Sequence, residues 1–71
     1  MEISYNKLWK LLVDKKMTGA DLRKAVGMAP NTMTKMRRDE VVSLEIIIRI
    51  CQCLNCDIGD VMELVPKEAA I

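Results

Sequence analysis

The stretch from Thr18 to Met36 constrains the fold of this chain more than any other, because it predicts two short helices joined by a tight turn. Thr18 is followed three residues later by Asp21, which is a capping-box pattern that begins a helix. Glycine can adopt a positive φ at no steric cost, so Gly27 is suited to end that helix sharply. Pro30 is favoured at the first position of the next helix. The pattern therefore predicts a helix on either side of Gly27.

The second of these helices has an apolar face and a polar face. Helical spacing turns Met33 and Met36 inward. The side chains predicted to point away from them are Pro30, Asn31, Thr34 and Lys35. Asparagine can form two hydrogen bonds to an adenine edge, and lysine can donate to guanine acceptors in the major groove of DNA. The polar face therefore predicts base reading in a DNA groove, with an ordinary solvated helix face as the alternative.

Three further helices are expected outside this pair. Their predicted ranges are about 4 or 6 to 15, about 44–54 and about 58–65. Ser43 and Asp57 stand at N-cap positions, while Asn55 and Pro66 are suited to end a helix. The residues expected to face the core from 44–54 are Leu44, Ile47, Ile48, Cys51 and Leu54. Because no strictly alternating strand pattern flanked by hairpin turns is present, the sequence predicts a single all-α domain over residues 1–71.

The run from Leu22 to Met33 resembles the helix-turn-helix of the XRE-type regulators, the family of phage Cro and the phage repressors. The resemblance continues through residues 43–45, 54–57 and 60–62, so it covers about residues 6–65. It implies a compact five-helix bundle of the lambda-repressor-like type. In that bundle the helix-turn-helix would occupy about residues 18–38, and the fourth and fifth helices would lie within about 44–65.

The resemblance also assigns contacts with DNA. Positions matching Asn31 and Lys35 commonly touch bases in this family, and the position matching Thr32 often touches a phosphate. Thr18 is a reasonable phosphate contact because helix N-termini attract anions, although a plain capping role is the alternative. The other expected contacts to the DNA backbone are the basic residues Lys15, Lys16, Arg37 and Arg38.

Three residues depart from the pattern of the family. Arg23 stands where alanine is usual between closely packed helices. Gly19 replaces a glutamine that often holds a phosphate, which predicts that this contact is lost or is made by the backbone alone. Ala29 stands where serine or threonine normally caps the recognition helix, so the first N–H groups of that helix lack a cap hydroxyl.

Charge is distributed unevenly along the chain. The 71 residues have a net charge of only +1, which by itself argues against a nucleic-acid binder. Residues 1–38, however, contain nine Lys or Arg against three acidic residues, whereas residues 39–71 contain two against seven. This polarity is typical of a molecule that presents one face to phosphates, and charge segregation by chance is the alternative.

Cys51, Cys53 and Cys56 form a C-x-C-x-x-C pattern that suggests a metal site. A closed structural zinc site needs four ligands, and the chain has no histidine and no fourth cysteine. Buried thiols at Cys51 and Cys56 are the favoured interpretation, with Cys53 exposed. We expect no metal and no cofactor. Because no catalytic motif is present, we also expect no enzymatic activity.

The apolar runs are too short to span a bilayer, and the N-terminus lacks the features of a signal peptide, so we expect a cytoplasmic protein without a membrane partner. The favoured function is a transcriptional regulator that binds double-stranded DNA. The expected homodimer would form through the fifth helix and the tail, and its candidate residues are Val61, Leu64, Val65 and Ile71. The alternative is a protein-binding module, antitoxin-like or co-regulatory, that binds a second protein rather than DNA.

Overall fold

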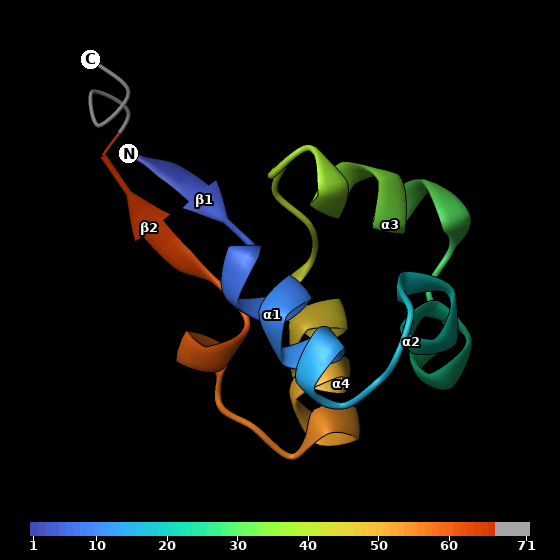
Figure 1. Ribbon diagram of the computed structural model, residues 1–71. Helices are drawn as coiled ribbons and strands as arrows, with labels where there is room; N and C mark the ends of the chain where they lie inside the picture. Colours follow the sequence, from blue (N-terminus) through green and yellow to red (C-terminus); the bar gives the residue numbers. More distant parts are fainter. Residues whose placement is uncertain (67–71) are drawn as a thin grey trace.

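Four α-helices and one short pair of strands form most of the chain, as the computed structural model shows for residues 1–66 (Figure 1). The elements in chain order are β1 (Glu2–Ser4), α1 (Asn6–Asp14), α2 (Gly19–Val26), α3 (Pro30–Arg37), α4 (Leu44–Leu54), the 3₁₀ helix η1 (Ile58–Asp60) and β2 (Glu63–Val65). The predicted ranges of the first four helices agree with these to within about one residue, apart from the alternative start at Ser4. In this part of the chain no helix is long and apolar enough to cross a membrane.

The turn between α2 and α3 forms as the sequence predicts. The Thr18 hydroxyl accepts a hydrogen bond from the backbone N–H of Asp21 at 3.1 Å, and the Asp21 carboxylate accepts one from the Thr18 N–H at 2.9 Å. At the other end of α2, Gly27 has φ 70°, and the Met28 N–H reaches back to the Arg23 carbonyl at 2.9 Å. This left-handed stop lets the chain reverse and begin α3 at Pro30.

Replacing Thr18 with alanine is expected to lower the free energy of unfolding by about 1 kcal/mol, because the Asp21 N–H loses its cap. Urea denaturation followed by circular dichroism measures the change. Thr34→Ala is a matched control, because Thr34 is exposed inside α3 and its loss is expected to change stability by less than about 0.5 kcal/mol. Equal effects at the two positions would show that the cap does not stabilise α2.

Apart from Tyr5, the core is built from aliphatic side chains and methionines, as expected for a chain without phenylalanine. All four helices contribute fully buried or nearly buried residues to one cluster. Its members are Tyr5, Leu8, Leu12, Leu22, Val26, Met28, Met33, Met36, Ile47, Ile50, Leu54 and Val61. This cluster holds α2 and α3 against α1 and α4, and so fixes the outward face of α3.

The buried face of α4 differs from the predicted one. Ile47 and Leu54 are buried as expected, but Leu44 is 61% exposed and Ile48 is 49% exposed. Ile50, which was not expected in the core, is completely buried. The prediction was wrong because it followed the apolar residues alone, and eight of the eleven positions of α4 are apolar. The polar residues Glu45, Arg49 and Gln52 share one face at helical spacing, and the buried face lies opposite them.

The predicted fifth helix does not form, and the expected all-α fold is corrected to four α-helices with a small sheet. The capping pair Asp57 and Asp60 does form its reciprocal hydrogen bonds, but around the single turn of η1. Beyond that turn the chain extends as β2 and pairs antiparallel with β1, with Ile3 opposite Leu64. The partner strand lies at the other end of the chain, so the local pattern at 58–65 carried no sign of it.

This correction divides the expected dimer surface. Val61 is completely buried in the core, whereas Leu64 in β2 is 61% exposed. Val65 is half-buried, and Ile71 lies outside the residues that the structure describes. The three described residues therefore do not form one face of a helix.

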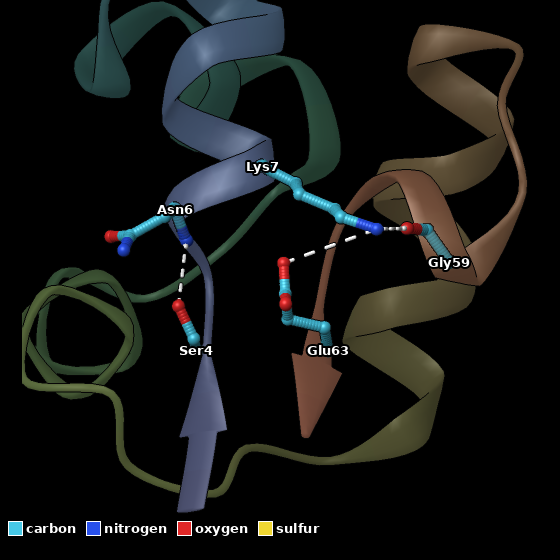
Figure 2. A network of polar contacts seen from close by, with 5 residues as sticks. All are labelled: Ser4, Asn6, Lys7, Gly59 and Glu63. Atoms are coloured by element: carbon cyan, nitrogen blue, oxygen red, sulfur yellow. Dashed lines mark hydrogen bonds and ion pairs between the residues drawn. The ribbon is translucent and has the colours of Figure 1, made fainter. Parts of the chain in front are cut away.

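Polar contacts fasten the strand pair to α1 (Figure 2). The Ser4 hydroxyl accepts a hydrogen bond at 3.3 Å from the N–H of Asn6, which is the first residue of α1. The Lys7 ammonium donates to the Gly59 carbonyl at 3.2 Å and lies 3.9 Å from a carboxylate oxygen of Glu63. The ion pair is largely exposed and contributes little stability, so its main effect is to align η1 and β2 with α1.

Tyr5 connects the start of the chain to the segment that follows α3. Its hydroxyl donates to the Glu40 carbonyl at 2.8 Å, and its backbone N–H donates to the Asp39 carboxylate at 3.1 Å. Asp39 has a left-handed φ of 57°, a conformation that aspartate tolerates better than most residues. Since Tyr5 is only 1% exposed, the contact fixes the exit of the chain from α3.

Replacing Tyr5 with phenylalanine is expected to lower the free energy of unfolding by about 1 kcal/mol at neutral pH, through loss of the bond to Glu40. Burial raises the pKa of the Tyr5 hydroxyl above its usual value of 10.0. The folded state therefore holds this proton more tightly than the unfolded state does. The resulting stability is complete below about pH 10 and is lost as the pH rises through the folded-state pKa.

Urea denaturation at several pH values tests this linkage. The difference in stability between the parent protein and Tyr5→Phe is expected to shrink above about pH 10, because only the parent has this phenol to ionise. A difference that stayed constant up to high pH would contradict the raised pKa.

Candidate nucleic-acid interface

α3 lies at the edge of the helical bundle (Figure 1), and its polar side is exposed to solvent. The structure brings the four predicted base-reading residues together on this side, and all four are exposed: Pro30, Asn31, Thr34 and Lys35. On the opposite side, Met33 is 7% exposed and Met36 is completely buried. The two methionines therefore fix the rotation of α3 and direct its amide, hydroxyl and ammonium groups to solvent.

The hydrogen-bonding state of these groups defines what each can recognise. Asn31 and Lys35 make no side-chain hydrogen bond to any of residues 1–66, so their donors and the Asn31 acceptor are available. The Thr34 hydroxyl, in contrast, donates to the Pro30 carbonyl at 3.2 Å. With its proton used inside the helix, the Thr34 oxygen can only accept a hydrogen bond from a ligand.

The first turn of α3 has no side-chain cap, as the alanine at position 29 predicts. The deficit is small, because Pro30 has no N–H and the N–H groups of Thr32 and Met33 both reach the Ala29 carbonyl, at 3.1 and 3.4 Å. Within the first turn this leaves the backbone N–H of Asn31. Thr32 itself is half-buried and lines a shallow pocket with Val42, Ser43 and other residues that follow α3.

Thr18 combines its capping role with a remaining donor. Its oxygen accepts from the Asp21 N–H, so the hydroxyl proton is not used in that bond. The N–H groups of Gly19 and Ala20 belong to the first turn of α2, where no intrahelical carbonyl is available to them. The Asp21 pKa is lowered, chiefly by the hydrogen bond from the Thr18 backbone, so this carboxylate remains charged at neutral pH.

The basic side chains around α2 and α3 are not neutralised by carboxylates in the part of the chain that is described. Residues 1–66 contain only two ion pairs, Lys7 with Glu63 and Arg49 with Glu45. Neither pair involves a residue of α2 or α3. Both Arg37, in the last turn of α3, and Arg38, just after it, are exposed. Positive charge is therefore available to an anionic partner on the same side of the molecule as α3.

Lys15 and Lys16 are placed differently from the other predicted backbone contacts. They follow the end of α1, which lies toward the end of α4 and away from α3 in Figure 1. Lys15 lines a surface pocket together with Asn55, Cys56 and Asp60. The structure therefore does not bring these two lysines together with the residues of α3.

Arg37 is held by residues that the sequence did not connect with it. Its guanidinium carbon lies 5.1 Å from the centre of the Trp9 ring, within the range of a cation–π contact. A β-carbon at Gly19 would overlap the Nη2 atom of Arg37, so the guanidinium contacts the start of α2. Trp9, Gly19 and Arg37 come from three different helices, and no spacing in the sequence indicates that they meet.

The cysteines lie at the end of α4. Cys51 and Cys56 are half-buried and Cys53 is exposed. The Cys56 N–H donates to the Cys51 carbonyl at 3.0 Å, across the left-handed turn at Asn55, so these two residues close the helix. Burial raises the pKa of the Cys56 thiol, which keeps it protonated at neutral pH. Among residues 1–66 no group of three possible ligand residues is close enough to hold a metal ion.

Comparison with known proteins places this arrangement in a family. The model of the Cro/C1-type HTH DNA-binding domain matches residues 7–67. The crystal structure of the transcriptional regulator VanUg, Form II, is 48% identical in sequence and superposes with a TM-score of 0.91, covering 93% of this chain and 88% of that one. No curated protein matches at a significant level. The chain therefore belongs to the family of Cro/C1-type helix-turn-helix DNA-binding domains.

Proposed function

We propose that this protein is a sequence-specific transcriptional regulator that binds double-stranded DNA with α3 in the major groove. The observation that carries the proposal is the outward face of α3, where Asn31 and Lys35 are exposed and make no side-chain hydrogen bond within residues 1–66. The similarity to the transcriptional regulator VanUg over 93% of the chain supports the regulatory role.

In this proposal, four residues of α3 face the base edges. Asn31 forms two hydrogen bonds to an adenine, and Lys35 donates to the acceptors of a guanine. Thr34 accepts from the amino group of cytosine or adenine, because its own proton is bonded to the Pro30 carbonyl. Pro30 packs at the start of the reading surface, where it leaves no N–H unsatisfied.

The DNA backbone is held by residues on either side of α3. Thr18 and Thr32 donate to phosphates through their hydroxyl groups, and Arg37 and Arg38 supply positive charge at the end of α3. Lys15 and Lys16 reach only phosphates that lie farther from the bases read by α3, because they follow the end of α1 that points away from α3. These contacts position the domain and carry no sequence information themselves.

The proposal includes a homodimer on an approximately palindromic operator. A two-fold dimer places two recognition helices about one helical turn of DNA apart. Because the predicted fifth helix is absent, the dimer contact is not assigned to it. Leu64, at 61% exposure in β2, is the residue of the expected surface that is most available to a second copy among those described.

The salt dependence of DNA affinity tests the proposal. Four basic residues are proposed to contact the backbone, so a plot of log affinity against log salt is expected to have a slope of about −3 to −4 for each protomer. Fluorescence anisotropy with a labelled duplex, from low to near-physiological salt, measures the slope. A duplex retained equally at every salt concentration, or no binding at low salt, would overturn the proposal.

A protein-binding module on the same scaffold is the second candidate. It is favoured by large apolar side chains that are exposed on α4 and close to its ends in the sequence. These are Val41, Leu44, Ile48 and Ile58, with exposures of 72%, 61%, 49% and 43%. An apolar interface of this kind is nearly insensitive to salt, so the same titration separates the two candidates.

A further inference from the structure

Trp9 and Gly19 together form a contact surface for the guanidinium of Arg37, and we call this surface the Arg37 seat. The Trp9 ring lies beneath the guanidinium, and Gly19 leaves the space that one of its terminal nitrogens occupies. These residues belong to α1, α2 and α3, and α3 carries the proposed DNA-binding face. We propose that Trp9 and Gly19 are positioning residues that hold Arg37 ready to bind a phosphate of the DNA backbone.

Arg37 is otherwise unengaged in the part of the chain that the structure describes. No carboxylate of residues 1–66 lies within ion-pair distance of it, and its side chain makes no hydrogen bond to those residues. A ring face attracts the guanidinium without using any of its N–H donors. The contact with Trp9 therefore orients Arg37 without using its N–H donors, and the donors that do not face Gly19 remain available for a charge-assisted hydrogen bond to a phosphate oxygen.

Holding the Arg37 side chain in one arrangement before DNA binds is expected to raise the affinity for DNA. A free arginine side chain samples many rotamers and loses that freedom when it contacts a phosphate. If the side chain is already held in one arrangement, less conformational entropy is lost on binding, and the affinity rises without any additional contact. Trp9 and Gly19 thus act on DNA affinity through Arg37.

Gly19→Ala is the sharpest test of the seat. The added β-carbon overlaps only the far end of a flexible side chain, so Arg37 is expected to move aside while the fold is retained. Gly59→Ala is the matched control, because a β-carbon at Gly59 meets nothing within 4 Å. Trp9→Leu removes the ring itself, and Trp9→Tyr keeps an aromatic face in its place.

The seat can be measured without DNA. Trp9 is the only tryptophan, so its fluorescence emission reports on the group that covers its ring. Arg37→Ala and Gly19→Ala are expected to shift the emission maximum to the red by a similar amount, whereas Gly59→Ala leaves it unchanged. An emission maximum that is the same in Gly19→Ala and the parent protein would overturn the proposal.

The effect on DNA is measured with one duplex across a range of salt. Gly19→Ala and Trp9→Leu are expected to raise Kd by about two- to fivefold on every duplex, the size of an exposed cation–π contact. They keep the charge of Arg37, so the salt slope is expected to remain as in the parent protein. Arg37→Ala removes the charge, and its salt slope is expected to be smaller in magnitude by about 1. Trp9→Tyr is expected to retain most of the affinity.

A double-mutant cycle separates positioning from a general structural effect. In the Arg37→Ala background, Gly19→Ala is expected to cause no further loss of affinity, because the residue that it positions is already gone. Additive losses would overturn the proposal.

This inference rests on the proposed DNA-binding function, and its failure is distinguishable from the failure of that function. A parent protein that binds no duplex at low salt overturns both. A parent protein that binds DNA with the expected salt slope, together with a Gly19→Ala variant of equal affinity, overturns the positioning role alone.

Discussion

Replacing Ile50 with alanine is expected to lower the free energy of unfolding by about 2–5 kcal/mol, more than the loss of any single hydrogen bond or helix cap in this domain. Ile50 is completely buried at the centre of α4, within the cluster that holds the helices together. The substitution removes apolar surface from the core and leaves a cavity that the neighbouring residues fill only in part. Urea denaturation monitored by circular dichroism measures the change.

Ile48→Ala is the control for this prediction, because it makes the same chemical change two residues away on the same helix. Ile48 is 49% exposed, and its truncation is expected to change stability by less than about 0.5 kcal/mol. A larger loss at Ile48 than at Ile50 would show that α4 packs with the face that contains Ile48, rather than with the face that contains Ile50.

Replacing Lys35 with alanine is expected to cost about 1–3 kcal/mol of discrimination at one base pair of the binding site. The Lys35 ammonium is exposed on the outward face of α3 and makes no hydrogen bond or ion pair within residues 1–66. Its removal is expected to relax the preference for guanine at that position and leave the preferences elsewhere in the site unchanged. Competition binding measures this change directly, with single-base variants of a duplex that the protein has selected from a random pool.

Arg38→Ala is the matched comparison, because Arg38 is also an exposed cation but lies just beyond the end of α3. Its loss is expected to weaken all duplexes by a similar factor and to reduce the magnitude of the salt slope by about 1. If Arg38→Ala altered the sequence preference while Lys35→Ala did not, the assignment of base and backbone contacts would be wrong.

The parts of the fold that the sequence predicts well depend on residues that are close together in the chain. Thr18 and Asp21 form their capping box across three residues, and Gly27 and Asn55 take the left-handed conformation at the helix ends where they were expected. These outcomes follow from hydrogen bonds and steric limits within one or two turns of the backbone.

One error concerns an interaction that is distant in the sequence, and the other concerns the orientation of a helix that is rich in apolar residues. At 58–65 Asp57 was recognised as a helix cap, but the pairing of Leu64 with Ile3 depends on a strand at the other end of the chain. In α4 the polar residues Glu45, Arg49 and Gln52 mark the exposed face, but the prediction followed the apolar residues alone. Leu44 was therefore assigned to the core and Ile50 was not. The first error arises because a distant strand decides the conformation of 58–65, and the second because the polar positions of α4 were not used to orient the helix.

The candidate interface shows the same division. The outward direction of Asn31 and Lys35 follows from the helical spacing of the two buried methionines, and the sequence alone was enough to predict it. The seat of Arg37 requires a glycine and a tryptophan from two other helices, and only the three-dimensional arrangement reveals it. Gly19, which in the sequence predicts the loss of one phosphate contact, makes room in the fold for the arginine that is proposed to form another.

Selection from a random duplex pool decides whether α3 reads sequence. The purified protein, kept reduced because Cys53 is exposed, is incubated with the pool at near-physiological salt, and the retained duplexes are sequenced. We expect enrichment of a split palindrome whose half-sites lie about ten base pairs apart, as two copies of α3 on one face of DNA require. Retention of no duplex, or of all sequences equally, would contradict sequence-specific recognition by α3 and favour the protein-binding alternative.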